Sequence, residues 1–146
     1  MTAEYRSVQT RMWREDDWFQ EQPTDARLLF IYLFTNPSAS VSGIYRLPLR
    51  TIIFESGLSA ERVNELLAQF SRENKAHVEN GVVWVVKMRE NQLPGKTLSD
   101  KIVTHLEGEI AKIPPCRLKN LYLQAYGYPI DTLSIPMCTD TKTDTI

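Results

Sequence analysis

The chain has 146 residues, of which 42% are hydrophobic and 24% are charged. This size fits one globular domain, or one domain with an appendage, and allows a core without a disulfide or a structural metal. Seventeen basic and eighteen acidic residues give a formal net charge of −1, which excludes nucleic-acid binding through a diffuse cationic surface. No apolar run approaches the ~18 residues of a membrane-spanning helix, and no signal peptide is evident. We therefore expect a cytoplasmic protein with reduced cysteines.

Three elements are predicted in the N-terminal part of the chain. Residues 5–10 alternate weakly between polar and apolar, which predicts a short strand, and residues 12–20 predict a short helix. Thr24 or Asp25 can cap a further helix. Its run ARLLFIYLF is apolar on nearly all sides, which is typical of a central helix.

The middle of the chain predicts a strand followed by two helices. Residues 43–47 predict the strand, and Pro48 fits the first turn of a helix through Glu55. Gly57 ends that helix, and Ser59 is a suitable N-cap for a second helix that reaches Arg72. The second helix carries one apolar stripe, made of Val63, Leu66, Leu67 and Phe70.

A hairpin and two more helices are predicted after residue 74. Asn80-Gly81 lies between two β-branched runs, which is a strong hairpin signal. A loop follows; then Ser99 caps one helix and Pro115 opens another, with Gly127 just past its end. The expected inward faces of these helices are Ile102, Val103, Leu106 and Ile110, and Leu118, Leu121, Tyr122, Ala125 and Tyr126.

The predicted fold class is mainly α with a small β-hairpin (α+β). The order helix, strand, helix, tight turn, helix, hairpin is that of a winged helix-turn-helix. We expect this domain at residues 1–92, a helical extension at 93–132 and a disordered tail at 133–146. The recognition helix is then 59–72, and the hairpin is the wing.

The recognition helix supplies the candidate DNA-binding residues. With the apolar stripe inward, Glu61, Glu65, Ala68 and Arg72 point outward. Arg, Asn and Gln read guanine and adenine edges, so the base-reading candidates are Arg62, Asn64 and Gln69. The phosphate candidates are Arg72, Lys75, Arg50, Arg6 and Arg11, and Asn80 marks the wing tip. Glu61 and Glu65 oppose DNA binding, because each would face phosphates. Two alternatives therefore stay open: this helix face is an ordinary solvated surface, or the domain is a protein-interaction module.

Several runs of sequence carry a family resemblance. They are the runs YRSVQTRMWREDDWF, TDARLLFIYLFTNP and SGIYRLPLRTI, which are followed by a helix and a hairpin with VVWV. In these runs the chain resembles the N-terminal winged-helix region of phage replication initiation proteins. These are the replisome organisers related to DnaD-like primosome proteins. The later run IPPCRLKNLYLQAYGY is similar to the helical segment that follows that region. The likeness covers about residues 5–128 and is loose in the recognition helix.

The resemblance implies origin binding at the start of phage genome replication in the bacterial host cytoplasm. It also implies self-association and recruitment of host helicase-loading or primosome proteins. From the residues alone, sequence-specific binding of double-stranded DNA competes with a protein–protein adaptor or a transcriptional regulator. The near-zero net charge predicts weak binding by a monomer, hence a homo-oligomer on repeated sites.

Other motifs give no support for catalysis. Gly95-Lys96-Thr97 lacks the earlier glycine of a phosphate loop, because Glu90 stands there. His105 and Cys116 form no recognisable catalytic pair, and a buried structural cysteine is expected. Glu15, Asp16, Asp17 and Glu21 form an acidic cluster, for which we expect a solvated helix start rather than a metal site. Core packing, rather than base stacking, is expected for Trp13, Trp18, Phe30, Tyr32, Phe34 and Trp84. We predict no enzyme activity, cofactor or metal.

Overall fold

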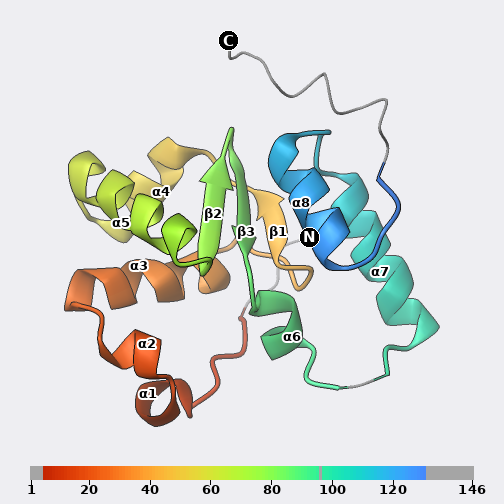
Figure 1. Cartoon of the computed structure of the whole chain (residues 1–146), viewed down its shortest axis with the longest axis horizontal. Coiled ribbons are helices and arrows are strands. Elements are labelled where there is room, and N and C mark those ends of the chain that lie inside the picture. Colours follow the sequence, from red (N-terminus) through yellow and green to blue (C-terminus); the bar gives the residue numbers. More distant parts are fainter. Residues whose placement is uncertain (1–4, 96, 131–146) are drawn as a thin grey trace.

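The computed structural model describes residues 5–95 and 97–130 and is a mixed α+β fold (Figure 1). Eight helices and one three-stranded antiparallel sheet lie within these residues. In chain order they are α1 (Met12–Glu15), α2 (Asp17–Gln20), α3 (Thr24–Thr35), β1 (Ile44–Arg46), α4 (Leu49–Ser56), α5 (Ala60–Arg72), β2 (Ala76–Glu79), β3 (Val82–Val85), α6 (Met88–Gln92), α7 (Asp100–Ala111) and α8 (Arg117–Ala125).

The sheet is the middle layer of three. Its strand order is β1-β3-β2, with Ile44 opposite Trp84 and His77 also opposite Trp84. Because side chains alternate along a strand, Ile44 and Trp84 face one core cluster while Tyr45 and Val83 face the other. Figure 1 shows α3, α4 and α5 on one side of the sheet and α7 and α8 on the other.

The first core lies between the sheet and helices α3, α4 and α5. The apolar stripe predicted for α5 is confirmed, since Val63, Leu66 and Phe70 are fully buried and Leu67 is half-buried. Burying one such side chain stabilises the fold by roughly 1.5–3 kcal/mol. The other fully buried side chains of this cluster include Ala26, Leu29, Leu33 and Ile52.

The turn between α4 and α5 follows the predicted local chemistry. Gly57 ends α4 in the left-handed region, with φ of +77°. Ser59 then caps α5, because its Oγ accepts a hydrogen bond from the Arg62 backbone N–H at 3.1 Å. Both predictions are confirmed, and they fix where the two helices end and begin.

The hairpin is also confirmed. Asn80 and Gly81 connect β2 to β3 with φ of 52° and 76°, which is the conformation of a two-residue type I′ turn. Gly accepts positive φ without strain and Asn tolerates it. Asn80 therefore lies at the tip, as expected.

Helices α7 and α8 form the second core against the other face of the sheet. The cap at Ser99 is confirmed, with a bond from the Ile102 N–H at 3.2 Å. The inward face predicted for α8 is partly wrong: Leu121 and Ala125 are exposed, whereas Leu123 is buried. The helix is rotated so that Leu123 joins the cluster that contains Ile44 and Trp84.

The N-terminal segment differs from its prediction. Residues 5–10 form no strand, because the Ser7 backbone bonds to the Gln92 side chain and the Gln9 side chain bonds to the Asn91 carbonyl. These partners lie in α6, which replaces part of the predicted loop. The segment is therefore held by side-chain bonds rather than by a strand ladder.

The predicted helix 12–20 is two short helices. Asp16 is extended between them, and its carboxylate caps α2 by accepting from the Phe19 N–H at 3.0 Å. The caps predicted for α3 at Thr24 or Asp25 are wrong. Pro23 is the N-cap residue and makes no side-chain cap bond, while the Asp25 carboxylate binds another helix.

Core packing is confirmed for most of the predicted aromatic residues but not for Trp13. Trp18, Phe30 and Tyr32 pack half-buried against the first core, and Phe34 and Trp84 are buried. Trp13 is 53% exposed and contacts Phe19 edge-to-face with ring centroids 5.3 Å apart. It lies on α1, which buries no residue. The predicted tail at 133–146 lies outside the described residues.

Candidate nucleic-acid interface

The outward face of α5 is polar and of mixed charge. The predicted outward positions are confirmed as exposed, and the exposed residues of α5 are Ala60, Glu61, Asn64, Glu65, Ala68, Ser71 and Arg72. Val63, Leu66 and Phe70 hold the opposite face in the core. Two carboxylates and one guanidinium therefore share the face that a major groove would meet.

Arg62 is held by carboxylates on both sides. Its Nε lies 2.6 Å from Asp25 Oδ2 and its Nη2 lies 3.2 Å from Asp25 Oδ1, while its Nη1 lies 3.3 Å from Glu65 Oε1. The hydrogen bond and charge of Arg62 lower the pKa of Asp25, and the hydrogen bond to Asp25 raises the pKa of Arg62. Arg62 thus fastens α5 to α3, and reading a base would require breaking a two-point ion pair.

The other two predicted base readers are bonded in different ways. Asn64 Nδ2 donates to the Ala60 carbonyl at 2.9 Å, within its own helix. Gln69 Nε2 donates to Gln22 Oε1 at 2.8 Å and to Glu73 Oε1 at 3.1 Å. Asn64 is exposed and Gln69 is half-buried, so Asn64 is the one of the two that lies on the outward face.

The predicted phosphate-binding residues divide into two groups. Arg50 is exposed in the first turn of α4, and Arg72 is exposed in the last turn of α5. Lys75 instead lies with its Nζ 5.0 Å from the Trp18 ring centroid, as a cation–π contact. Arg6 donates to the Ala39 carbonyl, and Arg11 Nε donates to Gln9 Oε1 at 2.8 Å. These last two belong to the N-terminal segment, away from the outward face of α5.

One cation near the hairpin tip was not among the predicted residues. Arg46 is exposed at the end of β1, opposite Val82, which directly follows Asn80 and Gly81. The pairing of β1 with β3 therefore brings Arg46 close to the tip of the hairpin. Its polar position in the strand GIYRL was the only sequence signal.

The far side of the hairpin is covered rather than open. Arg117 at the start of α8 forms an ion pair with Glu79 of β2, with Arg117 Nε 3.1 Å from Glu79 Oε1, and this hydrogen bond raises the pKa of Arg117. Beside it, the His77 ring bonds to Ser71 Oγ at 3.0 Å and to Asn74 Oδ1 at 2.8 Å. Burial lowers the pKa of His77, so it adds no cation at neutral pH.

The described residues do not assemble a cluster of metal ligands. In ranges 5–95 and 97–130, no three His, Cys, Asp or Glu side chains gather as metal ligands would. Cys116 is buried, as expected, and caps α8 through its Sγ. The helices of the same ranges are all too short or too polar to cross a membrane.

Comparison with models of protein families gave no match. Neither the curated proteins nor the solved structures contain a match to this chain.

Proposed function

We propose that residues 24–85 form a winged helix-turn-helix that binds double-stranded DNA, with α5 in the major groove. The observation that supports this most is the pair α4 and α5, joined at Gly57 and followed by a short hairpin, with one face of α5 free of the core. In line with the family resemblance of the sequence, we propose a role in phage replication initiation. The protein would act as an origin-binding replisome organiser.

The contacts follow from the positions of the exposed side chains. Asn64 can exchange its bond within the helix for an adenine edge, and Ala68 lets the helix approach the bases closely. Arg50, Arg72 and Arg46 are exposed and would meet phosphates, and such contacts position the protein without carrying sequence information. Binding is positioning rather than chemistry, so no cofactor is required.

The charge of α5 sets the expected strength of binding. Glu61 and Glu65 face the same way as Arg72, and carboxylates near phosphates weaken affinity. A single copy should therefore bind weakly, and several copies on repeated sites would bind more tightly. This supports assembly as a homo-oligomer on DNA.

A second candidate is a protein–protein adaptor. Phe54 on α4 is 85% exposed, and Glu61 and Glu65 are exposed on the next helix. Exposed aromatic and carboxylate side chains on neighbouring helices fit a protein partner better than a phosphate backbone. This face would then bind another protein of a replication or regulatory complex.

The deciding experiment is selection of duplexes from a randomised library, followed by binding of the selected duplex at several salt concentrations. Arg50→Ala and Arg72→Ala should each reduce, by about 1, the slope of the logarithm of the binding constant against the logarithm of the salt concentration. Arg14→Ala is the matched control, because Arg14 is exposed on α1. Asn64→Ala should relax sequence preference and leave the slope unchanged. Failure to retain any duplex at low salt would refute the proposal and favour the adaptor.

A further inference from the structure

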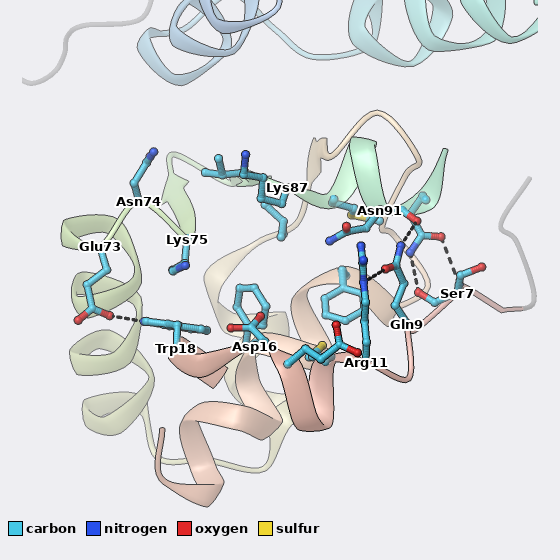
Figure 2. A pocket seen from close by; sticks show the side chains of 18 of the residues that line it. Ser7, Gln9, Arg11, Asp16, Trp18, Glu73, Asn74, Lys75, Lys87 and Asn91 are labelled. Atoms are coloured by element: carbon cyan, nitrogen blue, oxygen red, sulfur yellow. Dashed lines mark hydrogen bonds between the residues drawn. The ribbon is translucent and has the colours of Figure 1, made fainter. Parts of the chain in front are cut away.

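A groove separate from the outward face of α5 runs along the N-terminal segment (Figure 2). Its volume is about 770 Å³, and it lies between residues 7–18, the chain that leaves α5, and the connection from β3 to α6. This volume is within the range of sites that bind ligands, roughly 300–1,000 Å³. Apolar side chains contribute to its lining, namely Met12, Phe30, Phe34, Val85 and Met88.

Charges of both signs line the groove. Asp16 and Asp17 lie on the side of α1 and α2, where Arg11 also lines it, whereas Lys75 and Lys87 lie on the side of the strands, where Glu73 also lines it. Figure 2 shows Lys87 across the opening from Asp16. Among the described residues, neither Asp17 nor Lys87 takes part in an ion pair. Both exposed charges are therefore available to a ligand.

Trp18 is held rigidly at the edge of the groove. Its Nε1–H donates to Glu73 Oε1 at 2.8 Å, a bond that lowers the pKa of Glu73. Its ring meets Phe30 and Phe70 edge-to-face, with centroids 5.0 and 5.6 Å away, and Lys75 lies over it. The wall is thus formed before any ligand arrives, which reduces the entropy that binding must overcome.

The charges of the groove discriminate between classes of ligand. Four carboxylates contribute to the lining, those of Glu15, Asp16, Asp17 and Glu73, against three cations, those of Arg11, Lys75 and Lys87. A nucleic-acid strand would bring its phosphates against them, which is electrostatically unfavourable. A ligand that carries an anion, an apolar body and a cation would complement both sides, and a polypeptide segment supplies all three.

We propose that this groove binds an extended peptide segment of a protein partner, in which a large apolar side chain is flanked by one acidic and one basic residue. The acidic residue meets Lys87, the basic residue meets Asp17, and the apolar side chain enters between them. The inference goes beyond DNA binding and does not depend on it, because none of the proposed DNA-contacting residues Asn64, Arg50, Arg72 and Arg46 lines the groove.

The test is a nuclear magnetic resonance titration of the full chain with short blocked peptides. Two probes carry the cores Glu-Phe-Lys and Lys-Phe-Glu between Gly-Ser flanks, and two controls replace either the Phe by Ser or both charged residues by Gln. The indole N–H signal of Trp18, assigned with Trp18→Phe, is the readout. One charged probe should shift it saturably and the controls should shift it far less.

Charge-reversed variants locate the site. Lys87→Glu should weaken binding of the preferred probe about 5-fold or more, as loss of an exposed ion pair with added repulsion implies. Lys101→Glu makes the same change on an exposed position of α7 and should have no effect. The double variant Asp17→Lys with Lys87→Glu should bind more tightly the probe in which the acidic and basic residues stand in the reverse order. The proposal would be overturned if neither probe gave a saturable shift, or if the two lysine variants had equal effects. It would also be overturned if single-stranded DNA, rather than a peptide, shifted the Trp18 signal.

Discussion

Substitution of Gly57 by alanine gives a direct test of the turn between α4 and α5. Gly57 has φ of +77°, and a Cβ added there would meet no heavy atom within 4 Å. The cost of Gly57→Ala is therefore conformational rather than steric. A left-handed conformation costs an L-residue roughly 1–2 kcal/mol, and alanine recovers about 0.4–1 kcal/mol by restricting the unfolded chain. We expect a net loss of about 1 kcal/mol.

Gly108 provides a control with the opposite expected sign. It lies inside α7, it lacks the positive φ of Gly57, and its Cβ would also enter open space. Alanine stabilises a helix interior over glycine by roughly 0.5–1 kcal/mol. The same chemical change should therefore destabilise the protein at position 57 and stabilise it at position 108.

Urea unfolding and thermal melts of the unsubstituted protein, Gly57→Ala and Gly108→Ala measure the difference in the free energy of unfolding. A change of 1 kcal/mol corresponds to a shift in Tm of about 2–4 °C for a domain near this size. Gly57→Asn should lose less than Gly57→Ala, because asparagine tolerates the left-handed region better. If Gly57→Ala were as stabilising as Gly108→Ala, the turn would not hold its positive φ and the reasoning would be refuted.

Two further predictions concern an ion pair and the orientation of α8. Arg62 lowers the pKa of Asp25, so the pair stabilises the fold above the unfolded pKa of about 4, and this contribution is lost as pH falls through the folded pKa. Asp25→Asn should thus destabilise more at pH ~7 than at pH ~2, which urea unfolding at the two pH values measures. An equal effect at both would contradict the assignment. Leu123→Ala should lower the free energy of unfolding by about 2–4 kcal/mol. Leu121→Ala, at a 37% exposed site, should lower it by under ~1 kcal/mol. Similar losses for the two variants in urea unfolding would contradict the observed rotation of α8.

The parts of the fold that were predictable from sequence depend on local chemistry. The cap at Ser59 needs only a hydroxyl three residues before an amide, and the hairpin needs only Asn80 and Gly81 with positive φ between β-branched runs. The apolar stripe of α5 repeats within the helix itself. Each of these signals is contained within a few neighbouring residues, so no knowledge of the rest of the fold was required.

The remaining features depend on residues far apart in the chain. Asp25 and Arg62 are 37 positions apart. The shorter-range partner Glu65 lies three residues from Arg62, but nothing in the sequence near Arg62 indicates that Asp25 will also bind it. The rotation of α8 depends on which side chain fits against Trp84, and the N-terminal segment takes its partners from α6. The groove is likewise assembled from four separate segments, so its charges are brought together only by folding.

The covered sheet limits how the proposed wing can act. One face of the hairpin packs on the first core and the other packs on α8, where Tyr122 Oη donates to the Ser42 carbonyl at 2.7 Å and Arg117 pairs with Glu79. A hairpin held on both faces cannot swing to follow a groove; only its tip, with Asn80, remains exposed. Under the proposed function, the protein would therefore dock as a rigid body. Sequence discrimination would come from α5 and from the shape of the DNA rather than from adaptation of the wing.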